Sequence, residues 1–206
     1  TVGTGGMSPG GEGGEEYEEC GIAVVNGHSY EGPEKRTGNT NFAMLVSTQV
    51  TEPVNQPIEY GRYIAQLGNM LTGGPIMVQR LGDLLTGRRT TVSRLARSTT
   101  IPTLKTAVPG DLSFVLPPRH LTSIIEALRA FDHVAPGLFS KNTLLYGVEV
   151  KFYNSRVDVD ENLMTCVPDL YAVGDGSGVT HSLSQASASG VHIARRLAAK
   201  YAGCDR

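Results

Sequence analysis

The sequence predicts a mixed fold of the α/β or α+β class, on three observations. Short β-branched, apolar runs alternate with segments whose apolar residues recur at helical spacing. Hydrophobic residues make up 40% and charged residues 18% of the 206 residues, which is ordinary for a globular protein of one large domain or two small ones. A glycine-rich turn late in the chain lies between a short apolar run and a long helical segment.

The first 19 residues are predicted to form a flexible, glycine-rich lead-in. Seven of the first fourteen residues are glycine. Such a stretch buries too little apolar surface to offset the entropy lost on ordering. The sequence begins with threonine rather than methionine, so we expect a chain cut from a longer protein.

Residues 20–155 are predicted to form a domain of mixed sheet and helix. The β-branched and apolar runs predict strands at 42–51 and 144–153, and a short strand within 20–30 that runs into a loop at Asn26-Gly27. Shared apolar faces predict helices at 57–71, 76–87 and 121–134, with a short helix at 91–98. Four prolines between 88 and 119 favour extended segments and turns in the rest of that stretch.

Residues 156–206 are predicted to form a strand–turn–helix unit. Residues 156–163 are expected to form a strand or a turn into one, 170–173 a short buried strand of the central parallel type, and 182–201 a helix. Gly174 allows a sharp turn, and it places Asp175 where ligands bind in open α/β sheets. Gly176 and Gly178 lack a Cβ, so a phosphate or a ring can approach their amides near the positive end of the helix.

The run T-x-x-P-x-L-Y-A-x-G-D at 165–175, with the helix rich in small residues beyond it, resembles the second FAD-binding motif of flavoproteins with two dinucleotide-binding domains. The resemblance implies that Asp175 hydrogen-bonds the ribityl–pyrophosphate region of FAD. It also implies that amides of about Thr180–Leu183 lie at the pyrimidine edge of the flavin. The cofactor-binding residues that it implies are Gly174, Asp175, Gly176, Ser177, Gly178, Thr180, His181, Ser182 and Leu183.

The strings VNGHSY (25–30), VQRLGDLLTGRRT (78–90) and LLYGVEVKFY (144–153) extend the resemblance over about 20–200. There the chain is similar to the uncharacterised bacterial and archaeal NAD(FAD)-utilising dehydrogenases. This similarity implies an FAD-dependent oxidoreductase acting on a small molecule, with NADH or NADPH open as electron donor. Residues 20–155 would then be the cap on the substrate side, and 156–206 would complete a Rossmann-like FAD domain. The expected partner is the N-terminal FAD-binding half of the same protein, because the G-x-G-x-x-G phosphate loop is missing here.

Charge, apolar runs and cysteine content argue against several other classes of protein. A net charge of -2 does not favour nucleic acid, and no apolar run reaches the eighteen or so residues of a membrane span. The three cysteines, Cys20, Cys166 and Cys204, fit neither a disulfide framework nor a metal site, so a cytoplasmic location without a metal is expected.

Several alternatives stay open at this point. The basic stretch 79–105 fits an acidic substrate, the phosphates of FAD or of a nicotinamide cofactor, or a solvated face. His28 and His120 are candidate acids or bases near a flavin, or ordinary capping or surface histidines. No catalytic residue is assigned. The competing functions are a non-catalytic assembly module that binds no cofactor alone and a methyltransferase. The latter is disfavoured because only about thirty residues follow the glycine-rich turn.

Overall fold

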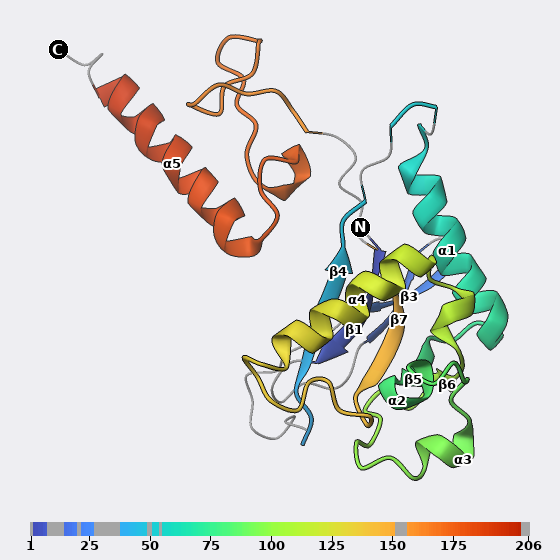
Figure 1. The fold of residues 1–206 in the computed structure, drawn as a ribbon. Coiled ribbons are helices and arrows are strands. Elements are labelled where there is room, and N and C mark those ends of the chain that lie inside the picture. The colour runs from blue at the N-terminus through green and yellow to red at the C-terminus, as the bar shows by residue number, and fades with distance from the viewer. Residues whose placement is uncertain are drawn as a thin grey trace. The chain divides into compact units, whose positions relative to one another are not determined.

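The computed structural model describes residues 2–7, 15–19, 22–26, 38–48, 51–53, 55–150 and 156–202. The chain divides into two compact units, Thr1–Phe152 and Tyr153–Arg206. The first holds a mixed sheet with helices, and the second holds loops, a short 3-10 turn and one long helix (Figure 1). The predicted mixed class is therefore confirmed.

A five-stranded sheet organises the first unit. Its strand order is β4-β1-β7-β5-β6. The strands are β1 (Val2–Met7), β4 (Asn41–Val46), β5 (Met77–Arg80), β6 (Val108–Pro109) and β7 (Leu144–Val150). β1 is antiparallel to β4 and β7, while β5 is antiparallel to β7 and parallel to β6. A separate antiparallel pair is formed by β2 (Glu15–Glu19) and β3 (Ile22–Asn26).

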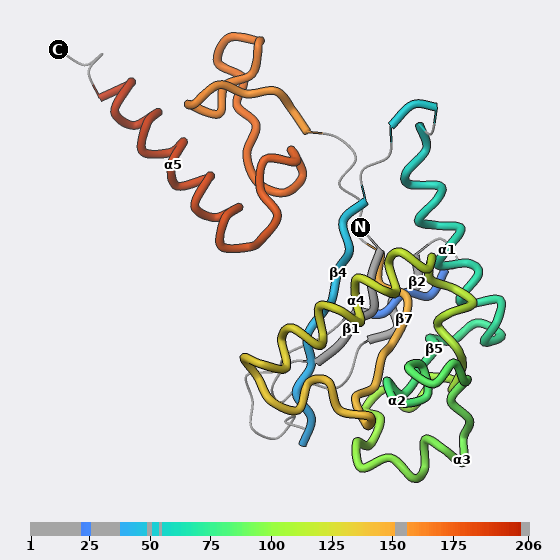
Figure 2. Tube along the Cα trace, viewed as in Figure 1, coloured from blue at the N-terminus to red at the C-terminus, as the bar shows by residue number. Residues whose placement is uncertain are grey.

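The helices of this unit begin where local signals allow. They are α1 (Pro57–Thr72), α2 (Leu81–Leu84), α3 (Val92–Leu95) and α4 (Pro118–Phe131), with a 3-10 helix η2 at Leu112–Phe114. α1 and α4 each start with a proline, whose missing N–H costs nothing in the first turn. α1 ends at Gly73 in the left-handed conformation, φ 76°. The tube in Figure 2 shows α4 running across β4, and α4 is in contact with both β4 and β1.

Strand β7 lies at the centre of the hydrophobic core. Leu145 and Val148 pack on one side of it, in a cluster with Ile64 of α1 and Ile124 of α4. The opposite side carries a second cluster, whose buried members are Val25, Ile76, Val78, Leu144 and Tyr146. Both faces of β7 are covered, which is why its sequence is almost continuously apolar rather than alternating. Burial raises the pKa of Tyr146 to about 12, so this phenol is a neutral packing group.

The N-terminal segment differs from the prediction. Residues 1–19 are expected to be a flexible lead-in, yet β1 is an interior strand with neighbours on both sides and β2 pairs with β3. The flexible lead-in is therefore wrong for Val2–Met7 and Glu15–Glu19. Backbone pairing with strands far along the chain satisfies the amides of such a segment, and local composition carries no signal of that pairing.

The predicted helix at 76–87 is also wrong over its first half. Residues Met77–Arg80 form β5, between β7 and β6, and the helix α2 covers only Leu81–Leu84. A short apolar run fits a buried strand and a helix equally well by spacing alone. Ile76 and Val78 are fully buried on the β3 side of the sheet, and this burial is what the strand provides.

In the second unit the predicted helix is confirmed as α5 (Leu183–Ala202). The predicted buried strand at 170–173 is wrong, because Tyr171 forms only an isolated antiparallel bridge with Met164. Leu170 and Val173 are 53% and 41% exposed. Across 156–163 the structure shows a turn and no strand. An apolar run becomes a buried strand only when other strands flank it. Among residues 156–202, the only β-pairing of this run is the single bridge between Tyr171 and Met164.

Candidate functional site

The glycine-rich turn follows Tyr171 directly. Gly174 has φ 76° and ψ -175°, and Gly178 has φ 70°, both in regions that side chains of L-residues avoid. Between them Asp175–Ser177 form the 3-10 helix η3. The predicted sharp turn at Gly174 is therefore confirmed, and Gly178 is a second position where the backbone requires glycine.

Asp175 is held in place by Thr180. The Thr180 hydroxyl donates a hydrogen bond of 2.6 Å to Oδ1 of Asp175, and Thr180 itself is buried. The Ser177 hydroxyl donates to the Gly174 carbonyl at 2.7 Å, which closes the turn. A carboxylate accepts several hydrogen bonds, so the half-buried Asp175 retains acceptor capacity for a hydroxyl group of a ligand.

The start of α5 is capped by a Ser-x-x-Gln pair. The backbone amide of Gln185 donates to the Ser182 hydroxyl at 3.2 Å. The backbone amide of His181 donates to the side-chain oxygen of Gln185, also at 3.2 Å. Helix geometry leaves the amides of Leu183 and Ser184 without an intrahelical acceptor. His181, Ser182 and Leu183 are all exposed, so these first-turn amides lie at an accessible surface.

Small residues of α5 hold the turn against the helix. Ser189 accepts a hydrogen bond of 3.1 Å from the Gly174 amide and donates one of 2.7 Å to the Ala186 carbonyl. A Cβ built on Gly174 would lie 3.8 Å from the Cβ of Ala186. The helix therefore approaches the turn closely through Ala186 and Ser189.

The turn and the start of α5 offer groups that could hold the sugar and ring-edge portions of a nucleotide cofactor. A Cβ built on Gly176 would meet nothing within 4 Å, so this side of the turn is open to a ligand. Asp175 offers an acceptor for hydroxyl groups, and the start of α5 offers donors for carbonyl oxygens. The sequence contains no G-x-G-x-x-G loop of the kind that holds a pyrophosphate.

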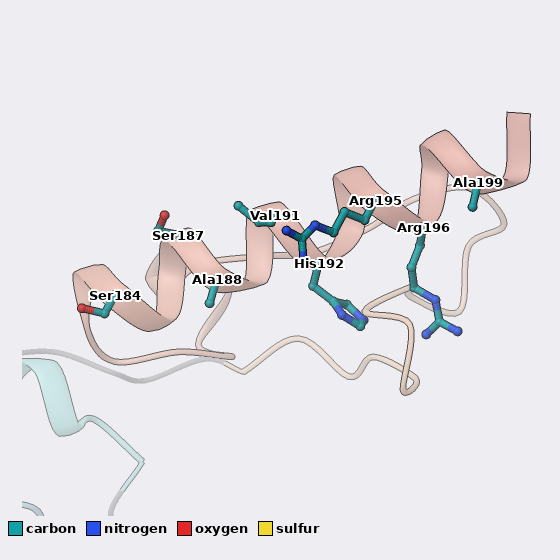
Figure 3. A pocket seen from close by; sticks show the side chains of 8 residues that line it. All are labelled: Ser184, Ser187, Ala188, Val191, His192, Arg195, Arg196 and Ala199. Carbon is teal, nitrogen blue, oxygen red and sulfur yellow. The ribbon is translucent and has the colours of Figure 1, made fainter. Parts of the chain in front are cut away.

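A shallow, open depression of about 720 Å³ lies along one exposed face of α5 beyond the turn. Figure 3 shows its lining, with His192 and Arg196 projecting to the same side of the helix. The lining residues are Ser184, Ser187, Ala188, Val191, His192, Arg195, Arg196 and Ala199. Their spacing of three and four marks a single helical face, but the motif alone gave no reason to select them.

Of the candidate histidines, His181 follows this turn and precedes α5. His28 falls outside the described residues. His120 belongs to the first unit, where its Nε2 lies 2.6 Å from the Thr48 hydroxyl at the end of β4. Its Nδ1 is buried and makes no hydrogen bond to the part of the chain that the structure describes. Burial, with the positive charge of Arg119, lowers the pKa of His120 below its usual value.

Two further properties concern the described residues only. None of their helices is both long and apolar enough to cross a membrane. In the same part of the chain, no three His, Cys, Asp or Glu side chains form a group that could hold a metal ion. Cys166 is an exposed free thiol, and Cys20 and Cys204 fall outside the described residues.

Comparison with known proteins gives one family. No curated protein matches the chain. The family model described as "FAD-dependent protein, C-terminal domain-like" matches residues 3–152, which is most of the chain. The match begins inside the segment expected to be a lead-in and contains β7, whereas the glycine-rich turn and α5 lie beyond it. This extent of agreement shows that the chain belongs to the family of C-terminal domains of FAD-dependent proteins.

Proposed function

We propose that the chain is the C-terminal part of an FAD-dependent oxidoreductase. In this proposal the second unit supplies the ribityl and flavin-edge half of the FAD site, and the first unit is the substrate-side cap of the complete protein. The observation that carries it is the Asp175 carboxylate, fixed by Thr180 in a turn that opens onto the start of α5. Membership of an FAD-dependent family supports flavin as the nucleotide.

The chain's own residues would bind and orient the cofactor. Asp175 would accept a hydrogen bond from a ribityl or ribose hydroxyl, with Thr180 keeping the carboxylate in one rotamer. The amides of Leu183 and Ser184, which have no intrahelical acceptor, together with the positive end of α5, would favour the electron-rich carbonyls at the pyrimidine edge. The bound flavin supplies the redox chemistry, and the protein supplies its position and its electrostatic surroundings. NADH or NADPH is proposed as the electron donor.

The exposed apolar residues of the second unit support a partner that covers them. Leu170, Val173 and Val191 are all exposed, and Leu183 is 89% exposed. Among residues 156–202, Ile193 is the one large apolar side chain that is buried. So small a core is marginal on its own. We infer that the N-terminal FAD-binding half of the same protein pairs with the 170–173 run and contributes the phosphate loop.

The test is to produce this chain together with its N-terminal half as one polypeptide. The purified protein should be yellow, with flavin absorption bands and one FAD per chain. Anaerobic NADH or NADPH should bleach the bands. Asp175→Ala should weaken FAD binding about tenfold or more, since a hydrogen bond to a charged group is worth about 1.5–3 kcal/mol.

Asp158→Ala is the matched control, because Asp158 is an exposed carboxylate in the same unit. It should retain FAD as the unaltered protein does. The 206-residue chain alone should bind FAD weakly or not at all. A complete protein that stays colourless and cannot be loaded with FAD would overturn the proposal and favour the cofactor-free assembly module.

A further inference from the structure

A buried aspartate lies among three arginines in the first unit. The side chain of Asp83, in α2, is only 4% exposed. Its carboxylate oxygens lie 3.8 Å from Nη1 of Arg80, 3.9 Å from Nη2 of Arg88 and 3.9 Å from Nε of Arg94. The Thr90 hydroxyl donates to Oδ2 of Asp83 at 2.9 Å. One carboxylate therefore faces three guanidinium groups from β5, from the loop after α2 and from α3.

The arginines do not use up their donors on Asp83. Separations of 3.8–3.9 Å exceed the usual range of an N–H···O hydrogen bond, about 2.7–3.2 Å. Instead, Arg94 donates to the Arg89 carbonyl at 2.7 Å, and Arg88 donates to the Thr86 hydroxyl at 3.1 Å. Each guanidinium carries five N–H groups, so most of these donors remain available for another acceptor.

Arg80 is the most deeply placed of the three. It donates to Asn142 Oδ1 at 3.0 Å and to the Arg94 carbonyl at 3.3 Å. Its Nε is buried and has no hydrogen-bond partner among the described residues. A buried donor without an acceptor costs free energy, and an acceptor bound at this position would remove that cost.

The charges do not balance. Arg80, Arg88 and Arg94 carry three positive charges against the single negative charge of Asp83, which leaves an excess of two. Asp83 is the only acidic residue in the sequence from Gln79 to Lys105. Arg88 and Arg94 are 54% and 29% exposed, so this excess charge reaches the surface. An anion with two charges would neutralise it.

We propose that Arg80, Arg88 and Arg94 form a binding site for a dianionic phosphoryl group, either free phosphate or the phosphate monoester of a small ligand. Guanidinium groups suit such an anion because their planar forks donate two parallel hydrogen bonds to its oxygens. The buried Asp83 and Thr90 act as positioning residues that hold the arginines together. The residues of this site belong to the first unit, whereas those of the proposed flavin site belong to the second.

The test is calorimetric titration of the 206-residue chain, at low ionic strength, with inorganic phosphate, NADP⁺ and NAD⁺. NADP⁺ differs from NAD⁺ by one phosphate monoester. Phosphate should bind saturably, and NAD⁺ should bind at least about tenfold more weakly than NADP⁺ if a ligand-borne monoester is recognised. Binding of phosphate alone, with neither nucleotide, would identify the free anion as the ligand.

Arg88→Gln and Arg94→Gln should each weaken phosphate binding about tenfold or more, and Arg88→Lys should give a smaller loss because it keeps the charge. Arg62→Gln is the control, since it removes the same charge from α1, where Arg62 pairs with Glu59. Circular dichroism would confirm that each variant folds. Absence of saturable phosphate binding, or an equal loss in Arg62→Gln, would overturn the proposal and leave a solvated basic face. Neither result changes the flavin content of the complete protein, so the two proposals fail separately.

Discussion

The side chain of Ser189, within α5, accepts a hydrogen bond of 3.1 Å from the amide of Gly174, where the glycine-rich turn begins. The same hydroxyl donates to the Ala186 carbonyl at 2.7 Å, and Ser189 is buried. The bond joins two residues that are fifteen positions apart in the sequence and closes the segment between them into one local structure. The position of Asp175, the next residue after Gly174, depends on this contact between turn and helix.

Replacing Ser189 by alanine tests that dependence. Ser189→Ala leaves the Gly174 amide without its acceptor and should lower the free energy of unfolding by about 1–3 kcal/mol. Urea denaturation of the complete protein would measure it, and FAD affinity should fall in parallel. Ser187→Ala, at an exposed position of the same helix, should have little effect. Equal losses in the two variants would argue against a specific tie between Gly174 and α5.

Alanine substitutions at Gly178 and Gly176 test two different roles of glycine in the turn, the relief of backbone strain and the space left for a ligand. Gly178→Ala places a Cβ at φ 70° and should destabilise the fold by about 1–2 kcal/mol. A Cβ on Gly176 meets nothing within 4 Å, so Gly176→Ala should leave stability unchanged. If a flavin nucleotide lies against this turn, Gly176→Ala should still weaken FAD binding. Thermal unfolding and FAD titration of the complete protein distinguish the two effects, and unaltered FAD affinity in Gly176→Ala would place the ligand elsewhere.

Helices were the most predictable part of the fold, because their signals are local. Pro57 marks the start of α1, and apolar spacing marks α4. The interior strand β1 could not be predicted, because its partners lie about 40 and 145 residues further along the chain. β5 was mistaken for helix because a strand of four residues, three of them buried, is too short for its spacing to distinguish strand from helix.

The candidate sites, like the fold, combine features that the sequence predicts with features that it does not. The positive φ angles of Gly174 and Gly178 could be expected from glycine alone. The bonds that fix the turn, from Thr180 to Asp175 and from Gly174 to Ser189, follow from folded geometry that no spacing rule reveals. The basic stretch was visible in the sequence, whereas the burial of Asp83 beneath its arginines was not.

His120 predicts a pH-dependent stability. Burial, with Arg119 adding to it, lowers the pKa of His120 below 6.5 in the folded state, so the unfolded chain binds the proton more readily. The stabilisation is therefore complete above about pH 6.5 and is lost as the pH falls towards the folded pKa, with a slope of at most about 1.4 kcal/mol per pH unit. Urea denaturation between about pH 7.5 and pH 5 would measure it. His120→Gln should flatten this slope, whereas His133→Gln, at an exposed position, should preserve it. A wild-type slope in His120→Gln would show that other groups cause the pH dependence.

The close approach of α2 to the loop before β7 gives the last prediction. The Gly82 amide donates to the Lys141 carbonyl at 3.1 Å, and a Cβ on Gly82 would lie 3.0 Å from that carbonyl oxygen and 3.2 Å from the Lys141 Cα. Backbone atoms cannot move aside as a side chain can, so Gly82→Ala should cost about 1–3 kcal/mol of stability, measured by urea denaturation. Gly38→Ala, where a Cβ meets nothing within 4 Å, should change stability by less than about 0.5 kcal/mol. Because Gly82 adjoins Asp83, displacement of α2 should also weaken phosphate binding at the arginines. Wild-type stability in Gly82→Ala would mean that α2 does not approach Lys141 this closely.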